Sequence, residues 1–432
     1  MEIPLEGNGA RRALLIVSVA AAALICFQAI RFWLADFRMH SRQLELMERG
    51  AAIEPGNAEA WDRLGRLQQW DFANPDPFQA ITDYLKAVQY DPHSANYWMD
   101  LASAYEAAGD FLRARSAFES ARKVYPISAE VSWNYGNFLL RRLEFSEGYA
   151  EIQRAVQADP SLLPLAISRT WRSNPDVNQL LDHVLPAGVD AYFQALDFFA
   201  SIHDTESGVK VWQRLVGLGK PFALSRSFPF LDELIREDRA DDAHHVWREA
   251  LVAAGKTYDE PAKHSLVWNG DFAQDISNGG LDWRWTPPVG VATGFDSAPP
   301  SGGIRSFRLD FGGGSNLELG QPTQYVPVEP GHTYRFHAQL RTEGITTESG
   351  MRFSIYDPNH AGGVNVLTDN LTGTQTWTAS EADVKTSPET HFLVIRIYRP
   401  TSRMFDNKLA GTVWIADVSL VPSDAPAGQP TP

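Results

Sequence analysis

The residue types that most often carry out catalysis are sparse in this chain. Its one cysteine, Cys26, lies in a charge-free apolar run, so the rest of the chain can build no disulfide, thiolate zinc site or thiol nucleophile. No glycine-rich phosphate loop, G-x-S-x-G or H-E-x-x-H motif occurs. His244 and His245 are adjacent, so on a helix they point to different faces, and we interpret both as solvated surface.

Paired carboxylates for glycoside hydrolysis leave no fixed spacing in a sequence, so that chemistry stays open as a minor alternative. With no other catalytic pattern, we predict a protein that is not an enzyme and needs no cofactor. The chain carries 38 Lys and Arg against 53 Asp and Glu, a formal net charge of −15. No basic run with interleaved aromatics occurs, which argues against nucleic acid as a partner.

The clearest periodic pattern covers residues 91–126. Apolar or small residues recur there at the spacing of two helices packed as a hairpin: Trp98, Leu101, Ala102, Tyr105, Ala114, Phe118, Ala121 and Pro126. Gly109-Asp110 supplies the turn between the helices. The pattern resembles a tetratricopeptide repeat (TPR), whose repeat length is 34 residues.

Neighbouring repeats are expected, because one such hairpin cannot bury its own apolar face. Pro92, Pro126 and Pro160 are each 34 residues apart, and Pro55 precedes Pro92 by 37 because residues 72–77 form a longer loop. We predict an all-α TPR solenoid over residues 38–255, regular to 160 and degenerate after it. Between 161 and 187 the register fails, and we expect prolines 164, 175 and 186 to interrupt helices.

The resemblance also implies a concave groove lined by the first helix of each repeat. Its candidate protein-binding residues are Arg66, Met99, Glu106, Trp133 and Asn137. Ser132 occupies the place where the neighbouring repeats carry tryptophan, and Trp133 is rotated one position toward the groove. We predict that Trp133, with Asn137 and Arg66, anchors a partner segment; a one-residue slip that returns Trp133 to the core is the alternative.

Residues 13–30 are free of charge and long enough as a helix to cross a bilayer. We predict an uncleaved signal anchor over residues 1–37, with a transmembrane helix at about 13–34. No small-x-small cleavage site follows, Ile25 before Cys26 does not suit a lipoprotein box, and a buried core helix would not be apolar all round. Arg11 and Arg12 are nearly balanced by Arg31, Arg38 and Arg42, so flanking charge alone does not settle the orientation.

The composition changes after residues 256–265, a polar stretch that we interpret as a linker. Over 266–421 short β-branched and aromatic runs such as MRFSIYD (351–357) alternate with turn residues, which predicts an all-β sandwich. Tyr334, Phe336 and Ala338 should face its core, because they alternate with polar residues. Residues 422–432 are predicted to be a disordered tail. The expected fold class is therefore multidomain: a transmembrane helix, an all-α solenoid and an all-β jelly roll.

Four segments of this domain resemble the jelly-roll carbohydrate-binding modules grouped with galactose-binding-like sandwiches. They are NGDF (269–272), VEPGHTYRFHAQLRT (328–342), TWT (376–378) and VWIADVSLV (413–421). The resemblance implies that the opening and closing segments lie side by side, and that the domain binds glycan. It also implies a structural calcium, but Ala273 and Ala416 replace acidic residues, so only Asp271 and Asp417 remain as doubtful ligands.

Sugar rings present an apolar face, so their binding sites use flat aromatic side chains flanked by polar groups. The candidate carbohydrate-binding residues are Arg352, Tyr356, Trp285 and Trp377, with Tyr398 also available. An aromatic residue in a sandwich is more often core, and we assign Trp283 and Trp414 to it. Arg352 and Tyr356 are favoured for the surface because they alternate with Met351, Phe353 and Ile355.

These patterns together predict a membrane-anchored adaptor of the bacterial envelope. Its repeats would hold a protein partner and its β domain would touch glycan, in a layout similar to accessory factors of exopolysaccharide or O-antigen assembly. Sugar binding outside the cytoplasm favours a single-pass inner-membrane protein with a periplasmic soluble part. The alternative is a purely structural scaffold whose β domain binds no sugar.

Overall fold

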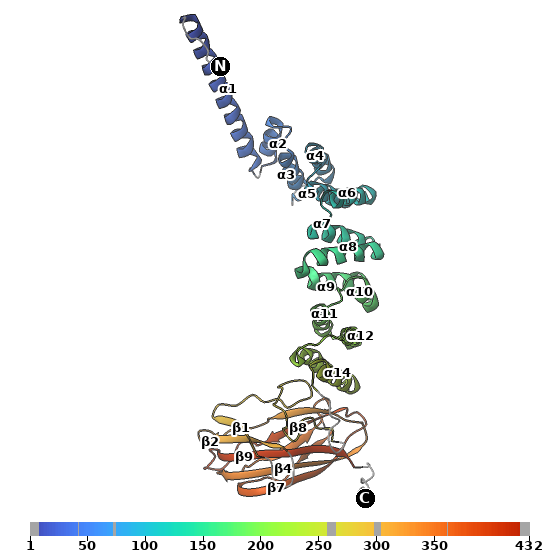
Figure 1. Cartoon of the computed structure of the whole chain (residues 1–432), viewed down its shortest axis with the longest axis vertical. Helices are drawn as coiled ribbons and strands as arrows, with labels where there is room; N and C mark the ends of the chain where they lie inside the picture. Colours follow the sequence, from blue (N-terminus) through green and yellow to red (C-terminus); the bar gives the residue numbers. More distant parts are fainter. Residues whose placement is uncertain are drawn as a thin grey trace. The chain divides into compact units, whose positions relative to one another are not determined.

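The computed structural model describes residues 8–41, 43–71, 75–256, 265–297, 304–360 and 362–423. Within these ranges the chain forms fourteen α-helices followed by nine β-strands. In Figure 1 the helices precede the strands along the chain. It divides into two compact units, Met1–Pro186 and Ala187–Pro432. Most of the predicted linker (257–264) and tail (424–432) lies outside the described residues.

Helix α1 (Asn8–Met39) exposes the apolar side chains of its long first part. Its span Arg11–Met39 is long and apolar enough to cross a membrane, by length and composition. Only its end packs, since Ala35 is fully buried and Met39 is 8% exposed beside α2 (Leu44–Ile53). The Arg31 Nη2 donates to the Ile53 carbonyl at 2.8 Å, so this arginine fastens α1 to α2.

Three helix pairs follow at the predicted period. They are α3 (Ala58–Gln69) with α4 (Pro77–Tyr90), α5 (Ala95–Ala107) with α6 (Phe111–Val124), and α7 (Ala129–Arg141) with α8 (Phe145–Ala158). The regularly spaced prolines come directly after second helices, and the indole N–H of Trp61 and Trp98 donates to the carbonyls of Pro55 and Pro92 at 2.8 and 2.9 Å. Equivalent bonds at equivalent positions show that the first two hairpins are repeats of one unit.

Small residues let the paired helices approach closely. Ala102, Ala114 and Ala121 are fully buried. A Cβ added to Gly65 would lie 2.8 Å from the Tyr84 ring, and one added to Gly136 would lie 2.9 Å from Ile152. Real side chains do not come this close, so glycine is required at both contacts.

The turns of four hairpins each contain one residue with positive φ. Gly109 has φ 79° between α5 and α6, as the sequence predicted, and Leu143 has φ 62° between α7 and α8. His203 (φ 57°) and Asp238 (φ 56°) occupy the same place in two later turns. These two turns therefore place a titratable side chain where the regular repeats have none.

Residues 160–186 form a shorter pair rather than a break. After the 3₁₀ turn η1 (Pro160–Leu162) come α9 (Leu163–Ser173) and α10 (Val177–His183). Pro164 lies in the first turn of α9, where proline is tolerated. Pro175 lies between the two helices and Pro186 lies after them, so the expected interruption is wrong for these helices.

The second unit begins with two helix pairs. They are α11 (Val189–Ser201) with α12 (Thr205–Gly217), and, after the 3₁₀ turn η2 (Leu224–Ser227), α13 (Phe228–Arg236) with α14 (Ala240–Ala253). Their apolar faces are buried, through Tyr192, Leu196, Phe199, Trp212, Leu215, Phe230, Leu231, Leu234, Ala243, Trp247 and Ala250. Gly208 is as close to the Phe230 ring as the glycines of the regular repeats are to their neighbours.

The remaining residues form a two-sheet sandwich. The strands are β1 (Val291–Ser297), β2 (Arg305–Gly312), β3 (Thr323–Pro327), β4 (Thr333–Ile345), β5 (Arg352–Tyr356), β6 (Asn365–Leu367), β7 (Gly373–Lys385), β8 (Phe392–Tyr398) and β9 (Ala410–Pro422). One sheet has the order β1-β2-β9-β4-β7 and the other β3-β8-β5-β6. All strand pairs are antiparallel.

The core of the sandwich follows the predicted alternation. Tyr334, Phe336 and Ala338 are at most 2% exposed. The opening and closing segments lie side by side, because Leu266 N donates to the Leu420 carbonyl at 2.8 Å. Trp283 is buried in the core, but Trp414 is partly exposed and donates to Asp296 Oδ2 at 2.8 Å, so its core assignment was wrong.

Candidate binding sites

Successive first helices of the regular repeats are linked by polar contacts between residues one repeat apart. Arg66 donates to Asp100 Oδ2 at 2.6 Å through Nη2, and Gln69 donates to Ser103 Oγ at 3.1 Å. Arg141 forms a bidentate pair with Glu106, both bonds 2.8 Å long. We call this set the first-helix surface: Arg66, Gln69, Met99, Asp100, Ser103, Glu106, Trp133, Asn137 and Arg141.

Two of the predicted groove charges are therefore already paired. Glu106 and Arg66 are held by the next repeat, and Met99 is only 8% exposed. The Asn137 side chain donates to the Trp133 carbonyl at 2.8 Å. The charged side chains of this surface are thus already paired with one another. A partner would contact the exposed parts of these side chains rather than unpaired charges.

Trp133 lies on the first-helix surface as a partly exposed side chain. Its neighbour Ser132 is 2% exposed and takes the core position. The helix has therefore not slipped by a residue to bury Trp133. Trp133 is the flat apolar group of this surface that a partner segment can cover.

Asp62 lies next to this surface and carries a displaced pKa. It is 2% exposed, and its Oδ2 is 3.1 Å from Arg66 Nε. Burial, with a smaller contribution from the Asp100 carboxylate, raises the pKa of Asp62 to about 7, against the lowering effect of Arg66. Asp62 can therefore gain or lose a proton near neutral pH while the protein remains folded.

The sandwich presents a second candidate surface on its four-stranded sheet. We call it the Tyr–Arg face: Arg352 and Tyr356 on β5, and Arg396 and Tyr398 on β8. All four side chains are partly exposed, whereas Met351, Phe353 and Ile355 are fully buried. The two ends of β5 follow the predicted alternation, but Ser354 between them is only 2% exposed. On β8, Arg396 and Tyr398 are the partly exposed residues.

The other predicted carbohydrate-binding residues lie elsewhere. Trp285 is 9% exposed and meets Phe307 edge to face at 5.7 Å within the core, so no ring face remains for a sugar. Trp377 lies on β7, the edge strand of the five-stranded sheet. The structure therefore brings Arg352 and Tyr356 together but separates both from Trp285 and Trp377.

The two doubtful calcium ligands come from segments that lie side by side, since Val418 N donates to the Gly270 carbonyl at 2.9 Å. Asp271 Oδ1 accepts a bond from the Ala273 N–H at 3.2 Å, and Asp417 has a positive φ of 51° in β9. In the part of the chain that the structure describes, the one group of three potential metal-ligating side chains is His203, Glu233 and Glu237. Neither aspartate belongs to it.

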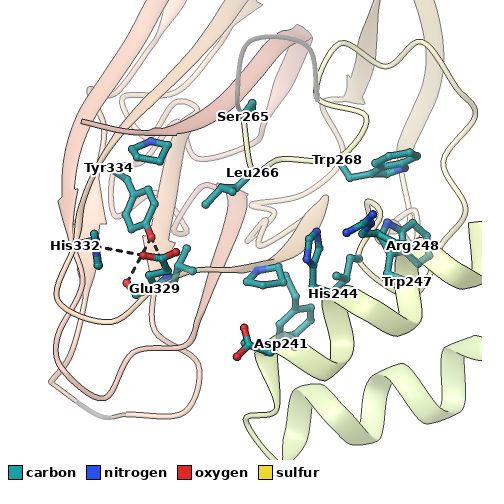
Figure 2. Close-up of a pocket in the computed structure, with 16 residues that line it drawn as sticks. Asp241, His244, Trp247, Arg248, Ser265, Leu266, Trp268, Glu329, His332 and Tyr334 are labelled. Carbon is teal, nitrogen blue, oxygen red and sulfur yellow. Dashed lines mark hydrogen bonds and ion pairs between the residues drawn. The ribbon is translucent and has the colours of Figure 1, made fainter. Parts of the chain in front are cut away.

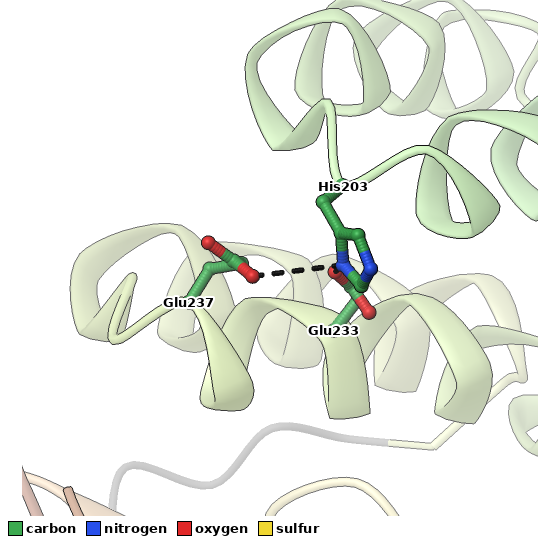
Figure 3. Close-up of side chains that lie close together, drawn as sticks. All are labelled: His203, Glu233 and Glu237. Atoms are coloured by element: carbon green, nitrogen blue, oxygen red, sulfur yellow. Dashed lines mark hydrogen bonds and ion pairs between the residues drawn. The ribbon is translucent and has the colours of Figure 1, made fainter.

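That group, shown in Figure 3, has a structural explanation. His203 Nδ1 is 2.7 Å from Glu233 Oε1 and 3.7 Å from Glu237 Oε1. The other oxygen of Glu233 is bonded by Arg236, so a metal would have to displace existing partners. We interpret the contact as the link that fastens the α11–α12 turn to α13.

Helix α14 and the sandwich enclose a cavity of about 430 Å³, drawn in Figure 2. Its lining includes His244 from α14, Trp268 from the opening segment, and Tyr325 and Pro327 from β3. Burial, assisted by Arg248, lowers the pKa of His244. His244 and His245 were both expected on solvated surface; His245 is exposed, whereas His244 is only partly exposed because the sandwich packs beside it.

The sequence analysis assigned neither Arg396, which lies on the Tyr–Arg face, nor the nearby Arg399 to a site. Arg396 lies in the run HFLVIRIYRP, where it is three residues from Arg399. Arg399 is fully buried and donates to the Ser349 carbonyl at 2.7 Å, whereas Arg396 lies on the sheet surface. Strand alternation alone could have separated the two, but only strand order reveals that Arg396 adjoins β5.

Comparisons with known proteins bear on the helical part. A family model described as tetratricopeptide repeat matches residues 99–162, the stretch from α5 to η1. No curated protein matches the chain. Among solved structures, the chain is similar to YrrB, described as a TPR protein with an unusual peptide-binding site, at 13% identity and a TM-score of 0.26 over 49% of this chain and 94% of that one.

Proposed function

We propose that this protein is a membrane-anchored, non-enzymatic adaptor that holds a protein segment on its first-helix surface and a glycan on its β-sandwich. The observation that carries the proposal is the set of TPR hairpins, supported by the family match over residues 99–162. Stacked hairpins of this kind present a continuous surface suited to an extended partner. The fold alone supports protein binding, and the glycan and membrane roles rest on further features.

The β-sandwich supports the glycan role through the Tyr–Arg face. Its tyrosines and arginines combine flat rings with hydrogen-bond donors, the groups that suit a sugar's apolar and hydroxyl-bearing faces. The jelly-roll resemblance of the sequence favours the same role. A bacterial envelope protein in exopolysaccharide or O-antigen assembly, with a periplasmic soluble part, fits this combination.

The protein-binding role is tested by capture of partners on the full chain in detergent. Trp133→Ala should reduce the yield of the specific partner at least tenfold, since a buried tryptophan anchor contributes about 2 kcal/mol or more. Leu112→Ala is the control, because Leu112 is 85% exposed on the second helix α6. If the Trp133→Ala variant captures the partner as well as the parent chain does, Trp133 is not part of the binding site.

The glycan role is tested separately by a glycan array probed with the full chain. Binding that Tyr356→Ala abolishes supports the adaptor. An array without any bound glycan would favour a structural scaffold, for which the packing of α13 and α14 against the sandwich is the supporting observation.

A further inference from the structure

The four residues of the Tyr–Arg face alternate as Tyr356, Arg396, Tyr398 and Arg352. The Arg396 guanidinium carbon lies 4.7 Å from the Tyr356 ring centroid and 5.0 Å from that of Tyr398. Tyr398 is the register partner of Arg352 on the neighbouring strand, which places their Cβ atoms about 5 Å apart. Cations and flat rings thus alternate across two strands.

Both arginines of this face lack a charge partner. Among the described residues, the side chains of Arg352 and Arg396 form no hydrogen bond or ion pair, and the Nε atom of each is buried without a partner. Five other arginines of the sandwich are paired with carboxylates: Arg284 with Asp232, Arg305 with Asp275, Arg308 with Asp296, Arg335 with Glu381 and Arg341 with Glu343.

Within the described ranges, Arg352 and Arg396 have no carboxylate partner although the chain carries a net charge of −15, and each also has a buried Nε without a partner. Tyrosine rings hold the Arg396 guanidinium on the sheet, so little side-chain freedom remains to be lost on binding. A planar guanidinium fixed in this way suits bidentate recognition of a carboxylate. Because no carboxylate of the described chain pairs with these two arginines, we expect a ligand that carries negatively charged groups.

The face is also bounded on one side. Phe392 and Val394 alternate with the inward-facing residues of β8 and are at most 1% exposed, yet they are not part of the sandwich core. Near them Asp238, in the α13–α14 turn, accepts a bond from Asn359 Nδ2 and contacts His391 Nδ1, both at 2.7 Å. The covered end limits how far a ligand can extend along β8 in that direction.

We propose that the Tyr–Arg face binds an acidic polysaccharide, with uronate carboxylates on Arg396 and Arg352 and sugar rings against the tyrosines. This inference rests on the proposed glycan role and narrows it to one ligand class. It predicts that affinity falls with rising salt concentration, because the recognised groups are charged and partly exposed.

The test measures binding of the full chain in detergent to polygalacturonate and to the same polymer with its carboxyls methyl-esterified. Arg396→Gln and Arg352→Gln should each weaken binding to polygalacturonate by roughly tenfold or more, the loss expected for one charge-assisted bidentate pair. Arg396→Lys should recover only part of it, since lysine keeps the charge but not the fork. Arg403→Gln is the control, because Arg403 is an exposed arginine on the loop after β8 and its loss changes net charge equally.

The expected result is tight binding of polygalacturonate, weak binding of the ester and an unchanged Arg403→Gln variant. Equal binding of both polymers would overturn the acidic specificity and leave the glycan role standing. Binding of neither polymer, with an empty glycan array, would remove both. Equal binding of poly-glutamate, with competition at the same site, would overturn the glycan assignment in favour of an acidic peptide.

Discussion

Asp62 is the residue whose protonation should govern the pH response of the first unit. In the fold its pKa is raised to about 7 from an ordinary 3.8, first by burial and then by Asp100. The folded state therefore binds more protons than the unfolded state between those two values. Its stabilising contribution is complete below about pH 4 and is lost as the pH rises through 7.

We expect the opening free energy of α3 to fall by roughly 2 kcal/mol between pH 5 and pH 8, at about 1.4 kcal/mol per pH unit below the folded pKa. Asp62→Asn should abolish this slope, because the amide does not titrate. Hydrogen exchange of the α3 amides, corrected for intrinsic rates, measures it. Glu45→Gln, at an exposed position of α2, should leave the slope intact; a slope that survives in Asp62→Asn would assign the response to another group.

The burial or exposure of a side chain was predictable from the sequence where it depends on the position of the residue within a single strand or helix. The burial of Phe353 and the exposure of Tyr356 follow from alternation along β5 alone. The placement of Trp285 in the core and of Trp377 on the other sheet depends on strand order, which no local pattern records. The displaced pKa of Asp62 likewise depends on tertiary packing, first through burial and then through Asp100 in the next repeat.

Paired helices in the repeats approach at positions where no side chain fits. Gly136→Ala should destabilise the first unit by about 1–3 kcal/mol, because the new Cβ would lie 2.9 Å from Ile152 Cδ1 and 3.1 Å from its backbone nitrogen. Gly217→Ala is the matched control, since Gly217 ends α12 and a Cβ there meets nothing within 4 Å. The control should be neutral or gain up to about 1 kcal/mol through helix propensity.

Unfolding in urea, followed by circular dichroism, compares these two glycines. Equal stability of Gly136→Ala and the parent chain would mean that α7 and α8 can separate at no cost. At this scale the sequence was informative, because proline spacing and small residues mark each hairpin. The α9–α10 pair was missed because its prolines lie at helix boundaries, and a proline count does not distinguish a boundary from a break.

Within the second unit, the last helix pair is fastened to the sandwich through the α13–α14 turn. Asp238→Gly removes the contacts to His391 and Asn359 while keeping the positive φ, which glycine adopts freely. We expect faster hydrogen exchange at the start of β8 and in the turn, because both are held by that carboxylate. Leu143→Gly is the control: it changes the same turn position in the α7–α8 hairpin, where the side chain is 69% exposed.

Unchanged exchange in Asp238→Gly would show that packing alone, such as the edge-to-face contact of Trp247 and Trp268 at 5.9 Å, holds the helices in place. This attachment was not foreseen from the sequence. The residues that make it are more than a hundred positions apart, and a polar stretch between them was interpreted as a linker between separate domains.

The exposed apolar surface of α1 leads us to expect that the protein is attached to a membrane. Large side chains along it, among them Leu15 (66% exposed) and Leu24 (61% exposed), contact no other part of the described chain. A surface of this length would aggregate in water, whereas a bilayer removes it from solvent.

We expect the full chain to stay with membranes after carbonate extraction. The double change Leu15→Arg and Leu24→Arg should release it, since each central arginine costs about 2.5–3.5 kcal/mol of insertion. Leu112→Arg on exposed α6 should not. Recovery of a soluble parent protein whose first residue lies within or after α1 would instead identify this helix as a cleaved signal sequence.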